Sequence, residues 1–404
     1  MMVYNTPRAL EGMKVIDSAT FIAGPIGAKI LGDMGADVIK VENRAVGGDA
    51  SRTAGSPFIE GVASFVQTLN AGKKCICINT KDPRGLELYY DLLRETDVYI
   101  DNRPVGSSEA LGLGYDKLKE INPGLIVIRV TGFGMTDSKY RDWAAFDPLF
   151  QGLTGFMAVN GEPNTPPLKA GVAVADCSGG VWVASAAMAA YIHKLKTGKG
   201  QLIDFSLACA YLALMENNVT TYSFSGVAPG KIGNKHPNVG PFNTYECSDG
   251  WVYVACGVDA QAFGLAKVIG HPELIDDERY KTPNLRVQNQ DWYEVFINEW
   301  ISQQTVEAAI EQLVAGGCTA GPIYTQEDVF KDDYFWGRNM LVKVDHPTIG
   351  EITIPGSPLS FCSETPAIVD KACGLLGAEN EEIFKGRLGL SDEDFETYMA
   401  EGVI

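Results

Sequence analysis

The sequence has few of the residues on which metal and nucleic-acid sites depend. It contains four histidines, His193, His236, His271 and His346, and none of them forms an HxH, HExxH or Cys/His pair at zinc spacing. Lysine and arginine number 33 against 51 aspartates and glutamates, which gives a formal charge of −18. Lysine and arginine make the contacts to nucleic acid and anionic membranes, so this balance argues against both partners. We therefore expect no metal, no nucleic acid partner and no membrane partner.

Disulfide and membrane signals are also missing. The nine cysteines are scattered without a CxxC pair, which favours reduced thiols in a cytoplasmic protein. The longest apolar stretch, residues 171–192, contains Asp176 and is rich in Gly, Ala and Ser, which is poor material for a membrane span. The N-terminus shows no charged segment followed by a long apolar run, so we expect no signal peptide.

What the sequence does contain is a regular alternation of strand and helix patterns. "MKVIDSATF" predicts a strand, "AGPIGAKILGDMG" a turn and a helix, and "ADVIKVEN" a second strand, which together form a βαβ unit. Gly24 and Gly27 do not complete a GxGxxG pattern, so a nicotinamide dinucleotide site is poorly supported. The alternation continues with strands at 74–79, 97–101 and 125–133, helices at 83–94, 115–122 and 178–200, and a strand and helix within 201–215. The fold class is therefore predicted as α/β, an open sheet covered by helices.

A second, smaller domain is predicted after a change in composition near residue 225. "SGVAPGKIGNKHPNVGP" is rich in Gly, Pro and Asn and predicts an exposed connection. "FNTYECSDGWVYVACG" predicts a hairpin with Asp249 and Gly250 at the turn, and helical patterns follow it. We place a large domain at 1–224 plus 340–404 and a small α+β domain at 225–339.

One acidic side chain, Asp176, stands in the small and apolar run "GVAVADCSGGVWVAS". Aspartate is a favoured helix N-cap, and the residues after it are suited to a helix. A carboxylate at a helix N-terminus is also held ionised by the helix dipole and the free N–H groups, and such a carboxylate can act as a nucleophile. Both interpretations fit the sequence at this point. The neighbouring Cys177 is interpreted as a small packing residue, because nothing in the sequence supplies an activating base.

Segments along nearly the whole chain resemble the family III CoA-transferases of the CaiB/BaiF type. The matching stretches include "LEGMKVIDSATFIAGPIGAKILGDMGADVIKVEN", "LNAGKKCICINTKDPRGLELYYDLLRETDVYIDNRP", "LGLGYDKLKEINPGLIVIRVTGFG" and "KTGKGQLIDFSL". The family includes formyl-CoA, carnitine, bile-acid and 2-hydroxyacyl CoA-transferases. The resemblance implies a large Rossmann-like, CoA-binding domain with a smaller domain, and a homodimer in which the two chains form interlocked rings.

The resemblance also implies a mechanism and a site. Asp176 matches the family aspartate that attacks an acyl-CoA thioester, giving a mixed anhydride and then an aspartyl-CoA thioester, from which an acceptor acid takes the CoA. The CoA thioester is a substrate, a carboxylic acid is the other partner, and no cofactor is bound permanently. We expect backbone N–H groups of Gly179 and Gly180 to stabilise the oxyanion, or these glycines to serve close packing, and Asp147 to border the active site. The positions that match CoA-binding segments are Ile22, Ala23, Lys73, Lys74, Asn102 and Arg103.

Two alternatives remain open from the sequence. An α-methylacyl-CoA racemase resembles this chain, but Phe146 stands where that enzyme has a histidine base, so two-base proton transfer lacks one base. A CoA-binding subunit without catalysis is the other alternative. The acyl groups are also open between carnitine-like, 2-hydroxy, aryl and bile acids.

Overall fold

The computed structural model describes residues 7–55 and 57–404, which divide into two compact units. The first unit combines the chain up to Thr154 with Gly171–Glu216 and Asp332–Ile404, and the second combines Gly155–Ala170 with Asn217–Lys331. The boundaries at residues 225 and 339 that composition suggested stay a prediction. Each unit has its own hydrophobic core and is described by itself below.

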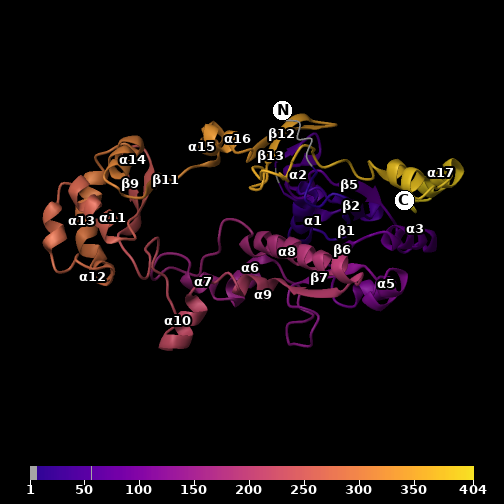
Figure 1. The fold of residues 1–404 in the computed structure, drawn as a ribbon, viewed down its shortest axis with the longest axis horizontal. Helices are drawn as coiled ribbons and strands as arrows, with labels where there is room; N and C mark the ends of the chain where they lie inside the picture. The colour runs from indigo at the N-terminus through magenta and orange to yellow at the C-terminus, as the bar shows by residue number, and fades with distance from the viewer. Residues whose placement is uncertain (1–6, 56) are drawn as a thin grey trace. The chain divides into compact units, whose positions relative to one another are not determined.

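A six-stranded parallel sheet forms the centre of the first unit (Figure 1). Its order is β5-β2-β1-β6-β7-β8, and every neighbouring pair is parallel. The strands are short apolar runs that lie buried between helices, as in sheets covered on both faces. They span β1 (Lys14–Asp17), β2 (Asp37–Glu42), β5 (Lys74–Cys77), β6 (Val98–Asp101), β7 (Ile126–Thr131) and β8 (Leu202–Ser206). The predicted α/β class is confirmed, and the structure adds that the sheet is parallel throughout.

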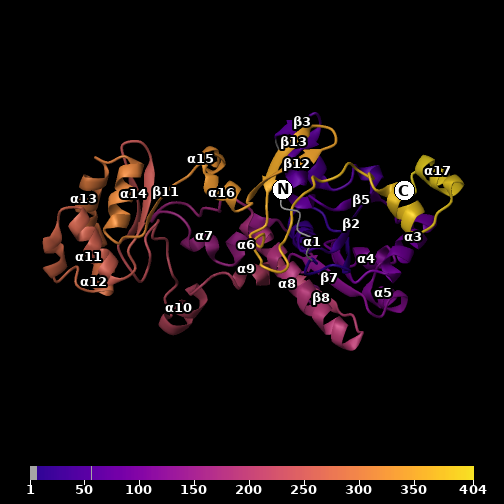
Figure 2. The same cartoon turned by 45° about the horizontal axis from the view of Figure 1, so that its top comes forward.

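Helices cover both faces of this sheet. Helices α1 (Ala23–Asp33) and α8 (Val174–Thr197) pack side by side in both cartoon views (Figures 1 and 2) and share a core that includes Ala28, Val183 and Ala187. A second core contains residues of α3 (Pro83–Arg94), α5 (Tyr115–Ile121) and α17 (Asp392–Ala400) together with Val403 and Ile404. Two hydrophobic layers therefore enclose the sheet, and the helix predicted at 83–94 is confirmed.

The order of the strands fixes where a ligand is expected. β1 lies between β2 and β6, and the chain moves outward in one direction to β2 and β5 and in the other to β6, β7 and β8. At such a reversal the loops that leave neighbouring strands diverge and open a crevice at the carboxyl ends of the strands. The loops after β1 and β6 are therefore the first places to look for a site.

The first unit also contains short elements around the sheet. These are η1 (Arg44–Val46), η2 (Ala50–Arg52), β3 (Phe58–Ile59), β4 (Val62–Ala63), α2 (Ser64–Asn70), α4 (Ser107–Ala110), α6 (Asp147–Leu153), α9 (Leu207–Leu212), α16 (Asp333–Gly337), β12 (Leu341–His346), β13 (Gly350–Pro355) and η4 (Glu382–Arg387). None of the helices within residues 7–55 and 57–404 combines the length and the apolar character that a bilayer crossing requires.

The second unit is built on a three-stranded antiparallel sheet in the order β11-β10-β9. The predicted hairpin is confirmed, because Glu246 pairs with Trp251 across a turn that contains Asp249 and Gly250. Tyr245, Val252 and Ile297 lie in a core formed by this sheet and the helices that follow it. The elements are α7 (Phe156–Val159), α10 (Asn218–Ser225), β9 (Phe242–Glu246), β10 (Trp251–Ala255), α11 (Asp259–Val268), η3 (Pro272–Asp276), α12 (Pro283–Gln288), α13 (Gln290–Ile301), α14 (Val306–Ala315), β11 (Ala320–Pro322) and α15 (Gln326–Lys331).

Candidate active site

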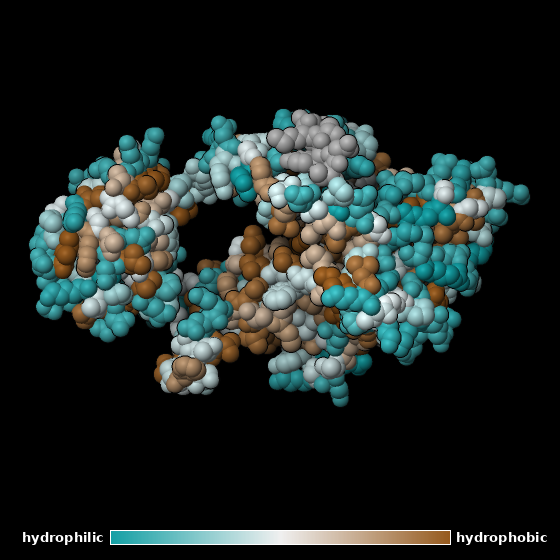
Figure 3. Space-filling model, in the orientation of Figure 1, coloured by the Kyte–Doolittle hydropathy of each residue, from teal (hydrophilic) through white to brown (hydrophobic). Residues whose placement is uncertain are grey.

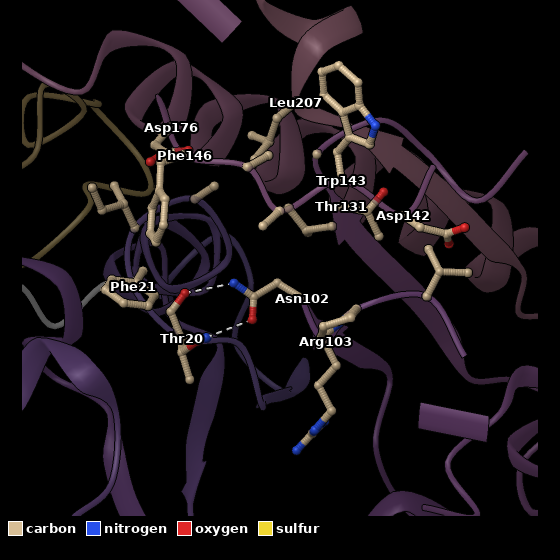
Figure 4. A pocket seen from close by; sticks show the side chains of 18 of the residues that line it. Thr20, Phe21, Asn102, Arg103, Thr131, Asp142, Trp143, Phe146, Asp176 and Leu207 are labelled. Carbon is tan, nitrogen blue, oxygen red and sulfur yellow. Dashed lines mark hydrogen bonds between the residues drawn. The ribbon is translucent and has the colours of Figure 1, made fainter. Parts of the chain in front are cut away.

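A cavity of about 400 Å³ opens at the carboxyl edge of the parallel sheet, where the strand order reverses (Figure 4). Its walls come from the turn after β1, the loop after β6, the end of β7 and the loop that precedes α6. Figure 4 shows Asp176 and Phe146 close together on one side, with Trp143 across the cavity. All these segments belong to the first unit. Of the residues predicted for the site, Asp176, Ile22, Ala23, Asn102 and Arg103 line the cavity.

Asp176 is in the first turn of α8 but does not cap it. The helix begins at Val174, and its N-cap position is Ala173. The interpretation of Asp176 as an N-cap is therefore wrong, because the helix starts two residues earlier than the aspartate suggests. The side chain is half-buried and faces the cavity.

Asp147 supplies the capping oxygen that was expected from Asp176. It is the first residue of α6 and is 5 % exposed. Its Oδ1 accepts hydrogen bonds from the backbone N–H groups of Ala175 at 2.7 Å and Asp176 at 3.4 Å, and its Oδ2 accepts from the side chain of Gln151. A carboxylate on one helix thus satisfies the free N–H groups of another. Asp147 is not one of the residues that line the cavity, so its place at the border of the active site stays a prediction, which its contact with the Asp176 N–H favours.

The surroundings of Asp176 disfavour its charge. Burial and, after it, the negative charge of Asp147 raise the pKa of Asp176 to about 6. A helix N-terminus alone would lower the pKa of a carboxyl, but here Asp147 already occupies the N–H groups at that end. Asp176 is thus an ionised carboxylate at neutral pH that is only weakly stabilised by its environment. This is the state that a carboxylate nucleophile needs.

Gly179 and Gly180 lie in the second turn of α8, where backbone N–H groups bond to carbonyls four residues earlier. A Cβ at Gly179 would come within 2.5 Å of Leu207, and a Cβ at Gly180 within 2.5 Å of Ile26. The geometry accounts for both glycines by the close approach of α8 to α1 and to the start of α9. Their role in stabilising an oxyanion stays a prediction.

Two phenylalanines line the same cavity as Asp176. Phe146 is 65 % exposed, lines the cavity and meets Phe21 edge to face, with ring centroids 5.8 Å apart and an interplanar angle of 88°. Phe21 has a φ of 64°, which a residue with a bulky side chain rarely adopts. Sequence reasoning did not find Phe21, because no residue pattern predicts a phenylalanine with a left-handed backbone conformation.

Asn102 and Arg103 form the wall between two cavities. Asn102 exchanges two hydrogen bonds with the backbone of Thr20, at 2.9 and 2.7 Å (Figure 4), and Arg103 binds Asp101 at 2.9 Å and Ser18 at 3.0 Å. A second cavity of about 300 Å³ lies on their other side and is lined also by Lys40, Asn43, Thr80 and Lys81. Lys81 is an exposed cation that lines this second cavity, and sequence reasoning did not find it.

The adjacent lysines Lys73 and Lys74 occupy unlike places. Lys73 is 4 % exposed, and its ammonium donates to Asp17 at 2.7 Å, Asn70 at 2.7 Å and the Pro25 carbonyl at 2.8 Å. All three of its donors are engaged, so we leave Lys73 out of the proposed CoA site. Lys74 opens β5 at the amino edge of the parallel sheet, opposite the cavity, and pairs with Asp37 and Glu382. The structure does not place either lysine on the cavity beside Asp176.

Buried charges hold the turn that forms the cavity wall. Lys40, 1 % exposed, donates to Asp49 at 2.7 Å and to the carbonyl of Ala19, and Asp49 accepts from the N–H of Phe21 at 3.2 Å. Together with Lys73 and Asp17, these groups connect β1, β2 and β5 to residues 19–25. Within residues 7–55 and 57–404 no group of three or more His, Cys, Asp or Glu side chains is arranged to hold a metal ion.

Comparison with known proteins places this architecture in a family. The family model described as CoA-transferase family III matches residues 10–380. The chain belongs to that family.

Its relatives include named enzymes. A succinate–glutarate CoA-transferase of Agrobacterium fabrum is 37 % identical over 94 % of this chain and 96 % of its own, and a human succinyl-CoA:glutarate CoA-transferase is 32 % identical over 99 % and 91 %. A crystal structure of a CAIB/BAIF family protein from Brucella suis is 37 % identical, with a TM-score of 0.84 over 94 % of this chain and 99 % of that one. The protein is thus a CoA-transferase, and acyl-CoA and carboxylate substrates fit it.

Proposed function

We propose that this enzyme transfers CoA between two carboxylic acids through covalent intermediates on Asp176. The observation that carries the proposal is the place of Asp176, a half-buried carboxylate on the cavity at the switch point of the sheet, with its pKa raised to about 6 by burial and by Asp147. It lines this cavity together with Arg103, Arg141 and Asp142, and the other lining residues have no titratable side chain.

The proposed reaction has two halves. A carboxylate oxygen of Asp176 attacks the thioester carbonyl, the C–S bond breaks, and CoA leaves as a thiolate beside an acyl-aspartyl anhydride. The thiolate then attacks the aspartyl carbonyl and releases the donor acid, leaving an aspartyl-CoA thioester. The acceptor carboxylate repeats these steps in reverse and leaves as its CoA ester. The thioester is exchanged rather than hydrolysed, so the reaction needs no other source of energy.

The nucleotide end of CoA is proposed to lie in the second cavity. Thr20, Asn102, Arg103 and Pro104 line both cavities, so a ligand that passes this wall reaches from one to the other. Arg103 and the exposed Lys81 supply positive charge for phosphate oxygens in a chain whose overall charge is −18. Ile22 and Ala23, on the first cavity, are left to contact the thioester end.

Dicarboxylic acids are the substrates we favour. The relatives named above act on succinate, succinyl-CoA and glutarate, which all carry a second carboxylate. Arg141 lines the cavity, with a side chain 38 % exposed that pairs only loosely with Asp142, at 3.6 Å. This guanidinium offers a partner for the distal carboxylate of such an acyl group. Carnitine-like, 2-hydroxy, aryl and bile acids are the other arms of a substrate panel.

We also propose that two copies assemble into the interlocked homodimer implied by the resemblance. Helix α8 packs Val183, Ala184 and Ala187 into the core, yet it exposes Val181, Trp182, Ile192 and Leu195 on other sides. Hydrophobic atoms gather over α6, α8 and α9 in Figure 3. A helix that is apolar on more than one face is normally covered on each of them. Trp182→Glu should therefore shift the mass in sedimentation toward the monomer, and a wild type that sediments as a monomer would overturn the assembly.

A cytoplasmic location is part of the same proposal. All nine cysteines are free thiols, including the buried pair Cys75 and Cys373 with sulfurs 3.8 Å apart. Close thiols that stay reduced suit a reducing compartment.

The decisive experiment traps the acyl enzyme. Wild-type protein is incubated with succinyl-CoA and hydroxylamine, and the modified peptide is identified by mass spectrometry. We expect a hydroxamate on Asp176 that needs the acyl-CoA. Modification at another residue, or none, would overturn the covalent mechanism. Exchange of labelled CoA between succinyl-CoA and glutarate distinguishes transfer from racemisation, because racemisation leaves the thioester intact.

A further inference from the structure

Phe21 and Phe146 form an edge-to-face aromatic pair that lies on a cavity wall instead of in the hydrophobic core. The rings come from separate elements, the turn after β1 and the loop before α6, and both line the cavity that contains Asp176. In Figure 4 the ring of Phe146 lies between the carboxylate of Asp176 and the ring of Phe21. Both rings keep much of their surface open, 37 % for Phe21 and 65 % for Phe146. Apolar surface that is left uncovered inside a cavity is surface for a ligand.

The backbone conformation of Phe21 is a second unusual feature of this pair. A φ of 64° suits glycine, whereas a residue that carries a Cβ is strained in this conformation. The strain is maintained by Asp49, which accepts the Phe21 N–H at 3.2 Å, and by the two hydrogen bonds between Thr20 and Asn102. Strain of this kind persists where the surrounding structure enforces it and commonly marks a functional site.

We propose that Phe21 and Phe146 shield the acyl group on Asp176 from water and so direct the enzyme toward transfer instead of hydrolysis. This inference rests on the proposed covalent function. An acyl-aspartyl anhydride is open to attack by water as well as by thiolate or carboxylate. Apolar rings beside the reacting carbonyl leave no hydrogen-bonding partner to hold a water molecule there. With an acyl chain against them, the two rings close the side of the site next to the Asp176 carboxylate.

The side reaction that the rings suppress is simple hydrolysis. The oxygen of water bonds to the acyl carbonyl carbon, and the bond from that carbon to the Asp176 oxygen breaks, which frees the Asp176 carboxylate. One proton of the water passes to the CoA thiolate, and the other is released to solvent as the new acid ionises. The sum is acyl-CoA plus water giving acid and free CoA.

The test measures both outcomes on the same enzyme. Transfer is followed as glutaryl-CoA formed from succinyl-CoA and glutarate, and hydrolysis as thiol released from succinyl-CoA without an acceptor. We expect Phe146→Ala and Phe21→Gly each to raise the ratio of hydrolysis to transfer about tenfold, because each opens the apolar wall to water. Phe146→Leu, which keeps an apolar side chain, should stay within about threefold of the wild type. Phe361→Ala is the matched control, since Phe361 is 51 % exposed and packs on Arg338 outside the cavity-lining residues.

Phe21→Gly separates shielding from architecture. If the ring were only structural, replacing a strained phenylalanine by glycine would leave the ratio unchanged, and transfer and hydrolysis would fall or rise in parallel. That result would overturn the inference, as would a Phe361→Ala enzyme with the same increased ratio. A wild type that forms no adduct on Asp176 would instead overturn the proposed function itself. An adduct on Asp176 together with an unchanged ratio of hydrolysis to transfer in the variants would overturn the shielding role and leave the proposed function standing.

Discussion

Two pairs of carboxylates near the carboxyl edge of the same sheet, Asp17 with Asp49 and Asp147 with Asp176, have opposite electrostatic surroundings. Asp17 and Asp49 face the ammonium groups of Lys73 and Lys40 at 2.7 Å. Burial tends to raise the pKa of Asp49, but the pairing with Lys40 brings it below its ordinary value. Among the described residues, neither Asp176 nor Asp147, which meet at the start of α8, forms an ion pair with a cation, and burial together with the charge of Asp147 raises the pKa of Asp176 to about 6. The paired charges hold the fold, and the carboxylate of Asp176 is the one that we propose to react.

The contrast shows where this protein gives up stability. A half-buried carboxylate beside a like charge is destabilising, and the nucleophilic role that we propose for Asp176 gives a reason for its presence. The paired cluster does the reverse, because it fixes residues 19–25, which form one wall of the cavity. The ion network therefore positions one wall of the cavity in which Asp176 is proposed to act.

Replacing the nucleophile should separate activity from stability most strongly. Asp176→Asn is expected to lower the transfer rate by about three orders of magnitude or more, as when a covalent nucleophile is removed. The same change removes a like charge beside Asp147, so the urea midpoint should stay the same or rise. Succinyl-CoA:glutarate exchange and urea denaturation measure the two quantities. Retained transfer would refute the covalent role, and a large loss of stability would refute the contrast between the clusters.

Breaking the lysine–aspartate cluster should lower the stability of the protein, in contrast to Asp176→Asn. Lys73→Met leaves Asp17 without its nearest cation in a site that is 0 % exposed, and we expect a loss of about 3–5 kcal/mol in the free energy of unfolding. The double variant Lys73→Met, Asp17→Asn should recover part of that loss, because no uncompensated charge remains. Urea denaturation at one protein concentration tests both. A single variant within 1 kcal/mol of wild type would show that Lys40, at 3.6 Å from Asp17, already suffices.

The pH dependence should reveal the like-charge pair. The nucleophile must be ionised, so kcat/KM is expected to fall as the pH drops below about 6. Asp147→Asn keeps an amide oxygen to cap α8 but removes the second charge, so the acidic limb of the pH profile should move to lower pH. An acidic limb that this variant does not move would belong to another group.

The same carboxyl should also make stability depend on pH. The folded-state pKa of Asp176 lies above 3.8, so the folded state binds more protons between pH 6 and pH 3.8, and the contribution of this group to stability increases as the pH falls through that window. Asp176→Asn should lack that pH-dependent contribution to stability.

The sequence predicted the sheet better than it predicted the details of the site. Alternating strand and helix patterns were enough to predict the α/β class and the helix at 83–94, but not the order of the strands, because burial between helices leaves a clear pattern along the chain and none that identifies neighbours in the sheet. The importance of Asp176 came from resemblance, and its capping role was wrong because Asp147, 29 residues away, takes that place. The left-handed backbone of Phe21 depends on the hydrogen bond that its N–H donates to Asp49 and on the hydrogen bonds between Thr20 and Asn102, and only the folded chain brings these groups together.

The smallest expected effect concerns the neighbour of Lys73. The two lysines of "AGKKC" cannot be distinguished by the sequence. In the structure β5 begins at Lys74, and Lys73 before it is 4 % exposed whereas Lys74 is more accessible. Lys74 pairs with Asp37 at 3.1 Å and with Glu382 at 2.9 Å, and its side chain is 34 % exposed. Solvent and salt screen such pairs, so Lys74→Met should cost no more than about 1 kcal/mol of stability. Because Lys74 lies at the amino edge of the sheet, the KM for succinyl-CoA should also stay unchanged. A clear rise in that KM would return Lys74 to the CoA site and would show that the assembled enzyme brings the amino edge of β5 to the ligand.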